Sequence, residues 1–315
     1  LDWTLADASN NHTVSLVWDT REVMTPTSAA GPICVACASP HTAERLPAMS
    51  LLTISAFLQD GSLTVLDQRS AQVTTGTLWS PSANQDAYLK ALTPGGGDEL
   101  GDTVRLNGDG TLLAAGTPLD DSGERGLGGT GSDDSADGAG SVALYERTAG
   151  GWQHALYVKA SNADAGDRFG RELALSADGR TLAVGASNED GAATGVNGDE
   201  DNNAREDAGA VYVFVRVASG AWFQQAYVKP DLADAQDRFG HYVALSADGN
   251  VMAISAVGED SASVGVNGNA ADNGAADAGA VYVFRRFGAT WQQEAYIKAS
   301  NAGAGDRFGD AVSLS

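Results

Sequence analysis

The sequence predicts an all-β fold, a β-propeller of four-stranded antiparallel blades preceded by a β-rich N-terminal region. The first observation behind this is a repeat, because four equivalent glycines stand 69, 70 and 69 residues apart, at Gly101, Gly170, Gly240 and Gly309. The second is that each repeat of about 70 residues contains four short apolar runs joined by glycine-rich or acidic segments. The third is that these runs show no helical period of 3.6 residues.

Two copies of the repeat are clear, at 152–216 and 222–286. A further copy starts near the end of the sequence, and a looser one lies at 87–121 and closes at 138–147. We therefore expect a repeat domain over 86–315, with three full units and the start of a fourth. Closed propellers have about four to eight blades. Either the ring continues in chain outside this sequence, or the first residues complete it by pairing with 310–315.

The strands of the clearest unit follow from alternation and from its β-branched and aromatic residues. Asp178 and Gly179 supply a tight turn between the second and third strands, since glycine takes a positive φ at no steric cost. The third and fourth strands are apolar on both faces, so a blade must bury both faces against its neighbours. A parallel β-helix is the alternative architecture, although it uses shorter rungs than this period. The predicted strands are 155–159, 172–176, 181–186 and 210–215, with a long loop at 187–209.

The first 85 residues form a separate β-rich region in which the repeat is not clear. Alternating apolar runs predict strands at 13–18, 51–57 and 62–66. The last two flank Asp60 and Gly61, which is typical of a β-hairpin. The region is either a degenerate blade or a small β-sandwich joined to the repeats.

Composition excludes several classes of partner. The formal net charge is −22 and the pI is near 4.3, and like charges repel nucleic acid and anionic membranes. No apolar run approaches the length of a transmembrane helix, so we expect no membrane insertion. The two cysteines, Cys34 and Cys37, form a single CxxC pair that is structural or bridged, or binds metal, or is redox-active.

The long acidic loops are the candidate metal sites. Ca²⁺ takes several oxygen ligands from clustered carboxylates, amides and backbone carbonyls on a turning loop. In the loop 187–209, oxygen-bearing side chains alternate over five positions and other carboxylates flank them; the next unit repeats the pattern with fewer charges. The alternative is a loop tied by Asx turns, notably at the recurring Asp121, Asp190 and Asp260. The candidate ligands are Glu189, Asp190, Asn197, Asp199, Asp201 and Asp207, and then Glu259, Asp260, Asn267, Asn269 and Asp277.

Four further positions recur in the units. The aspartate of each DRFG motif is predicted to fix its turn through a contact with the neighbouring Arg or with the backbone, and the phenylalanine to pack between blades. A lysine either pairs with a nearby Asp or guards a strand edge. A tryptophan on the outer strand either covers the blade edge or stacks on sugars. The residues are Asp167, Asp237 and Asp306; Phe169, Phe239 and Phe308; Lys159, Lys229 and Lys298; and Trp152, Trp222 and Trp291.

The motifs resemble a known family. Phe169–Gly170 followed by Gly185–Ala186, and Phe239–Gly240 in the next unit, are similar to the FG-GAP repeat of integrin α-subunit propellers. The resemblance to the bacterial secreted type is closer still, and it covers about three quarters of the chain, 88–315. The first unit departs from the motif, with Leu100 in place of Phe.

The resemblance implies a propeller, usually seven-bladed, on a secreted or surface protein that acts in adhesion or ligand binding, often with calcium. The integrin-type calcium loop precedes the GAP strand and carries three aspartates, whereas this chain has only Asp178 there. The long loop is therefore the better candidate for calcium.

No catalytic motif such as GxSxG, HExxH or a phosphate loop is present, so we expect no enzyme. The sequence favours an extracellular or cell-surface binding, adhesion or structural module with a protein or glycan ligand. The alternatives are the propeller domain of an extracellular hydrolase, or a subunit of a homo-oligomer or larger extracellular assembly.

Overall fold

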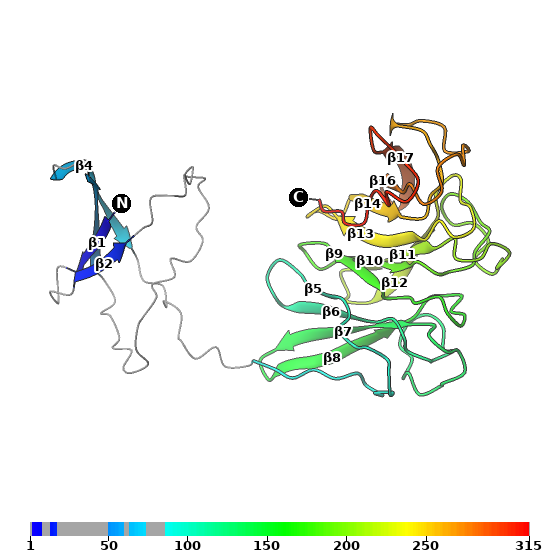
Figure 1. The fold of residues 1–315 in the computed structure, drawn as a ribbon. Helices are drawn as coiled ribbons and strands as arrows, with labels where there is room; N and C mark the ends of the chain where they lie inside the picture. The colour runs from blue at the N-terminus through cyan, green and yellow to red at the C-terminus, as the bar shows by residue number, and fades with distance from the viewer. Residues whose placement is uncertain (1, 8–12, 18–49, 60–62, 74–85, 315) are drawn as a thin grey trace. The chain divides into compact units, whose positions relative to one another are not determined.

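The computed structural model describes residues 2–7, 13–17, 50–59, 63–73 and 86–314 (Figure 1). The chain divides into two compact units, Leu1–Gln85 and Asp86–Ser315. All regular elements of the described residues are β-strands, as the sequence predicts, and none is a helix.

The first unit contains one antiparallel sheet in the order β2-β1-β3-β4. Strands β3 and β4 form the predicted hairpin, with Ser50 opposite Val73 and a register shift after Ala56. The hairpin tip at 60–62, together with Cys34 and Cys37, lies outside the described residues. The first strand was not predicted from the sequence. The strands are β1 (Asp2–Asp7), β2 (Thr13–Val17), β3 (Ser50–Gln59) and β4 (Leu63–Val73).

The second unit contains three antiparallel sheets, which we call the first, second and third repeat sheets. The first has the order β5-β6-β7-β8, comprising Val104–Leu106, Leu112–Thr117, Ser141–Thr148 and Gly151–Val158. The second has the order β9-β10-β11-β12, comprising Glu172–Leu175, Thr181–Ala186, Ala210–Arg216 and Trp222–Val228. The third has the order β13-β14-β16-β17-β15, comprising, in sequence order, Phe239–Leu245, Val251–Ala256, Gly265–Val266, Ala280–Phe287 and Thr290–Lys298.

The predicted strands exist, but the predicted unit is out of phase with the sheets. The run at 155–159 belongs to β8, which pairs with β7 of the first repeat sheet and not with the strands that follow it. The reason is the length of the connections. A short turn at 217–221 folds β12 back onto β11 as a hairpin, whereas the longer segment 159–171 crosses from one sheet to the next. Strands β8, β12 and β17, which we call the outer strands, therefore each come from the start of the next sequence repeat.

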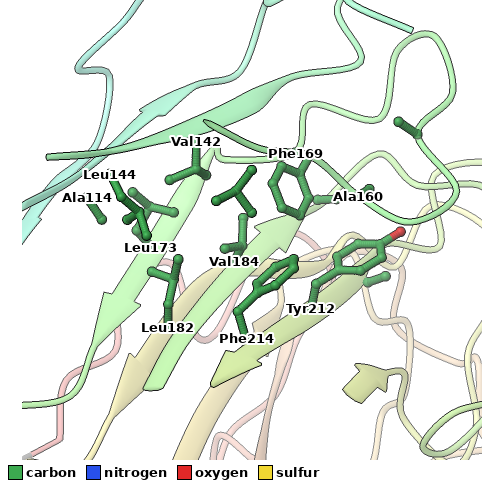
Figure 2. Packing of buried hydrophobic residues seen from close by; sticks show 14 of the residues in the cluster. Ala114, Val142, Leu144, Ala160, Phe169, Leu173, Leu182, Val184, Tyr212 and Phe214 are labelled. Carbon is green, nitrogen blue, oxygen red and sulfur yellow. The ribbon is translucent and has the colours of Figure 1, made fainter. Parts of the chain in front are cut away.

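The three repeat sheets stack face to face in sequence order, as Figure 1 shows. Side chains from the first and second sheets share one core, drawn in Figure 2, which contains Val142 and Leu144 of the first sheet with Leu173 and Phe214 of the second. The opposite face of the second sheet shares another core with the third sheet. Both faces of the second sheet are thus buried, as the two-sided apolar pattern predicts. The described residues form no closed ring, so the propeller itself stays a prediction.

The motif phenylalanines lie in these shared cores. Phe169 is fully buried, and its ring centroid lies 5.3 Å from that of Tyr212 and 6.1 Å from that of Phe214. Phe239 repeats the arrangement between the second and third sheets. The predicted packing between sheets is confirmed for these two, whereas Phe308 is half-buried.

The motif glycines bring neighbouring sheets into backbone contact. A Cβ atom on Gly185 of the second sheet would lie 2.2 Å from the carbonyl oxygen of Gly240 in the third. A Cβ on Gly116 of the first sheet would lie 2.0 Å from the carbonyl oxygen of Gly170. No side chain fits at either position, so the close approach of the sheets requires glycine.

Candidate functional site

Three long loops leave the repeat sheets at the same end, because each connects the second strand of its sheet to the third. In Figure 1 they lie along the right side of the stack. Each loop folds back to touch the outer strand of its own sheet: β15 pairs with β17, Val196 forms a bridge with Val228, and Leu127 forms one with Val158. The loops span 118–140, 187–209 and 257–279.

A buried ion pair anchors the second loop to β12. Lys229 Nζ lies 3.0 Å from Oε2 of Glu189, and Tyr227 donates a 2.9 Å hydrogen bond to Oε1 of the same carboxylate. Burial lowers the pKa of Lys229 and raises that of Tyr227, where the neighbouring Glu189 charge adds to the effect. The carboxylate accepts from both groups, so neither of the two buried charges lacks a partner.

The same arrangement recurs in the other two sheets. In the third, Glu259 pairs with Lys298 and accepts a 2.7 Å hydrogen bond from Tyr296. In the first, Asp120 accepts a 2.8 Å hydrogen bond from Tyr157, while the shorter aspartate leaves Lys159 Nζ at 3.6 Å. The sequence analysis left the lysines as partners of an Asp or as edge charges. The structure makes them buried partners of Glu189, Glu259 and Asp120. The Tyr-x-Lys spacing could have predicted this arrangement. Residues two apart on a strand share a face, so the tyrosine and the lysine can reach the same carboxylate.

The recurring aspartates that directly follow Asp120, Glu189 and Glu259 tie the base of each loop. Asp190 Oδ1 accepts a 2.8 Å hydrogen bond from the amide of Asp207, and Asp260 Oδ1 accepts one of 2.7 Å from the amide of Asp277. Asp121 accepts a bond of 2.8 Å from the amide of Gly138. Each carboxylate thus joins the start of its loop to a backbone amide near the end of the same loop. A loop tied in this way is the alternative to metal ligation that the sequence left open.

The middle of the second loop and that of the third are also held by an amide side chain. Asn197 has a φ of 58°, and its Oδ1 accepts a 3.0 Å hydrogen bond from the amide of Tyr227. Asn267 has a φ of 56°, and it accepts a 2.9 Å bond from the amide of Tyr296. Both asparagines therefore continue the pairing between loop and outer strand in a left-handed conformation that Asn tolerates.

The structure does not gather the predicted calcium ligands around one point. Glu189 and Glu259 are buried against lysines. Asp207 Oδ1 accepts a 2.9 Å hydrogen bond from the side-chain amide of Asn188, and Asp201 lies 3.6 Å from the guanidinium of Arg125. Asp199 Oδ1 accepts from the amide of Asp201 at 3.3 Å, and Asn269 Oδ1 accepts from the amide of Ala271 at 3.2 Å. Among residues 86–314, no group of three or more His, Cys, Asp or Glu side chains is placed to hold a metal ion. Calcium binding therefore stays a prediction.

The DRFG aspartates have the predicted backbone contact. Oδ2 of Asp167 accepts a 3.0 Å hydrogen bond from the amide of Asp164, and Oδ2 of Asp237 accepts one of 2.7 Å from the amide of Asp234. Both side chains are buried, which the sequence analysis did not foresee. Burial raises the pKa of Asp167 to about 8 and that of Asp237 to about 7. Asp306 makes the equivalent 2.8 Å bond but is exposed.

One repeat of the second unit matches a known family. Residues 152–214 match the family model described as the FG-GAP repeat. The chain carries an FG-GAP repeat. The matched segment contains both Phe169–Gly170 and Gly185–Ala186, so the resemblance seen in the sequence is confirmed. No curated protein matches the chain.

The glycines of the FG-GAP motif lie where adjacent sheets approach through their backbones, and its phenylalanine packs in the core that two sheets share. The motif residues therefore stabilise the contact between adjacent sheets. The match begins at the outer strand of one sheet and ends in the third strand of the next, at Phe214. It therefore spans a junction between sheets and not a single sheet. Within the described part of the chain, no helix is long and apolar enough to cross a membrane.

Proposed function

We propose that the FG-GAP repeats of this chain form part of a β-propeller that acts as a binding or adhesion module outside the cell or at its surface. The observation that carries the proposal is the alignment of three anchored acidic loops along one end of a stack of like sheets. FG-GAP repeats are typical of extracellular or surface proteins, which supports the location. The ligand would be a protein or a glycan that meets the loop tips.

The anchoring of the loops supports this role, because a pre-ordered surface loses less conformational entropy on binding than a flexible one. The base of the second loop is fixed by the Lys229–Glu189 ion pair, and its middle by Asn197. Its tip at 199–203 is mostly exposed and carries Asp, Glu and Asn side chains. The third loop has the same anchors and an exposed, less charged tip at 269–273.

Calcium is the cofactor that the sequence and the family resemblance suggest for these tips. The test is the melting temperature of the protein with added CaCl₂ and with a chelator. A higher melting temperature in calcium that Asp199→Asn with Asp201→Asn abolishes would support binding at the second tip. Equal melting temperatures in both conditions would remove calcium from the proposal.

The loop surface can be tested on an array of extracellular matrix proteins and glycans probed with the labelled full chain. The variant replaces the tips 199–203 and 269–273 with Gly-Ser sequence. A matched control replaces the exposed turn 288–289 between β16 and β17 instead. We expect binding that the tip variant loses and the control keeps. Binding that survives the tip exchange, or no binding on the array, would contradict the proposal.

A further inference from the structure

A groove of about 330 Å³ lies between the outer strands of the first and second repeat sheets, β8 and β12. The indole of Trp222 and the aliphatic side chains of Ala155 and Leu156 line it, together with the charged pair Arg216 and Glu146. Its volume is at the lower end of the range for small-molecule sites. None of these residues belongs to the loop tips of the proposed binding surface.

The equivalent junction between the second and third sheets is closed. There, Trp291 is only 2% exposed, and its Nε1 donates a 3.0 Å hydrogen bond to Oε1 of Gln225 on β12. The guanidinium of Arg286 lies over the indole ring at 5.4 Å from the centroid. A side chain on each side of the indole thus fills the space that stays open beside Trp222.

One change that opens the groove is on the neighbouring outer strand. Gln225 is the extra residue at the bulge of β12, where the register shifts between Val213 and Phe214. Ala155 is the extra residue at the corresponding bulge of β8. An alanine methyl group therefore stands where the next junction has a long amide that reaches the tryptophan. Ala155 is exposed and leaves one side of Trp222 uncovered.

The second change draws the arginine away. Arg216 corresponds to Arg286, but it pairs with Glu146 of the first sheet and donates a 3.2 Å hydrogen bond to the carbonyl oxygen of Gly220. At the next junction, Val215 occupies the place of Glu146 and offers no charge. Arg286 there turns to the indole and to Oδ1 of Asn250. The groove beside Trp222 is thus lined by an aromatic surface, a carboxylate and a guanidinium.

We propose that this groove binds one neutral hexopyranose unit of a glycan. The C–H face of a pyranose ring packs on an indole, and its hydroxyl groups both donate and accept hydrogen bonds. The carboxylate of Glu146 can accept from a hydroxyl and Arg216 can donate to one, so a diol can use both. A purely apolar ligand would desolvate this ion pair without replacing its water contacts. The net charge of −22 disfavours acidic sugars.

The inference goes beyond the proposed loop surface and does not depend on it. The groove is lined mainly by residues of the strands, with Leu127 of the first loop and the turn residues Gly220 and Ala221. Exchange of the tips 199–203 and 269–273 leaves all of them in place. The proposed loop surface and the proposed sugar site can therefore fail separately. A protein that loses array binding on tip exchange can still bind sugar in the groove, and a protein that binds no sugar in the groove can still bind a ligand through its loop tips.

The experiment titrates the full chain with methyl β-glucopyranoside, methyl β-galactopyranoside, methyl α-mannopyranoside, cellotetraose and maltotetraose. Tryptophan fluorescence and ligand-observed saturation-transfer NMR report binding. Ala155→Gln rebuilds the closed junction, Trp222→Ala removes the aromatic surface, and Gln153→Ala changes an exposed residue of β8 outside the groove. Melting temperatures show whether each variant is folded.

We expect at least one of these saccharides to bind, with the affinity reduced about tenfold or more by Ala155→Gln, which corresponds to about 1.4 kcal/mol. Gln153→Ala should bind as the unchanged protein does. If Trp222→Ala fails to fold, Ala155→Gln decides alone, because it only enlarges an exposed side chain. Absence of binding across the whole panel, or binding that Ala155→Gln leaves unchanged, overturns the proposal.

Discussion

Lys229 Nζ lies 3.0 Å from Oε2 of Glu189, and the two side chains are 0% and 1% exposed. One partner ends the outer strand of the second repeat sheet and the other begins its long loop, 40 residues earlier in the chain. A buried pair of this kind adds little stability relative to apolar residues, but its charges are costly to separate. It therefore specifies where the loop attaches to the sheet.

Removal of Lys229 should destabilise the repeat unit strongly. Lys229→Met leaves Glu189 buried without its counter-charge, and we expect a loss of about 3–5 kcal/mol in the free energy of unfolding. Urea unfolding followed by tryptophan fluorescence measures this loss. The double variant Lys229→Met with Glu189→Leu removes both charges and should recover most of it. A single variant that loses less than about 1 kcal/mol would mean that water reaches the pair.

The equivalent lysine of the first sheet should matter less. Lys159 Nζ is buried but lies 3.6 Å from Asp120 Oδ1 and has no hydrogen-bond partner. The cost of burying this ammonium is poorly offset, so Lys159→Met should cost less than Lys229→Met by about 1 kcal/mol or more. Parallel urea titrations of the two variants provide the comparison. Equal losses would show that the longer ion pair is as favourable as the shorter one.

Asp167 should make stability fall as the pH rises. Burial raises its pKa from 3.8 to about 8 in the folded protein. Between about pH 4 and pH 8 the folded state therefore holds a proton that the unfolded state has released. Stability is greatest below this window and is lost as the pH rises through it, by at most about 1.4 kcal/mol per pH unit.

The variant Asp167→Asn carries no titrating group and can still accept the hydrogen bond from the Asp164 amide. Melting temperatures at pH 5, 7 and 9 should therefore decline less in Asp167→Asn than in the unchanged protein. Asp306→Asn is the matched control, because Asp306 makes the same local bond in an exposed position. If Asp167→Asn and Asp306→Asn follow the same pH profile, the carboxyl of Asp167 titrates as an exposed group does.

The sequence was sufficient for the strands of the clearest repeat and for the packing of the motif phenylalanines, but not for β1. The run 181–186 is β10 with the same bounds, because its residues are apolar on both faces and a turn and a polar loop flank it. Phe169 could be assigned to packing between sheets because its spacing repeats, whereas the close approach at Gly185 is known only from the structure. The phase of the sheets could not be read from the repeat, because a periodic sequence has no marked start. Only the short turn at 217–221 decides which sheet takes β12.

Residue types alone did not predict the role of the acidic side chains in the candidate site. Acidic residues in a loop suggest a cation, but the nearest cation to Glu189 is Lys229, which is far away in sequence and reached only through the fold of the loop. The carboxylate of Asp190 accepts a hydrogen bond from the backbone amide of Asp207. The sequence alone does not distinguish this contact from metal ligation by the same carboxylate. Burial, not composition, distinguishes these roles.

The contact between Gly185 and Gly240 offers a direct test of the stacked sheets. Gly185 does not have a positive φ, so a substitution there acts only through space: the new Cβ would lie 2.2 Å from the carbonyl oxygen of Gly240. Backbone cannot move aside as a flexible side chain can, and Gly185→Ala should cost about 3 kcal/mol or more. Gly150→Ala, in the exposed turn between β7 and β8, meets no atom closer than 3.7 Å.

We expect Gly150→Ala to change the free energy of unfolding by no more than about 0.5 kcal/mol. Urea midpoints of the two variants, measured with the unchanged chain, give the comparison. If Gly185→Ala unfolds at the same midpoint as Gly150→Ala, the second and third sheets do not approach through their glycines. The propeller proposal would then lose its support, because a ring of sheets needs each sheet to pack closely on the next.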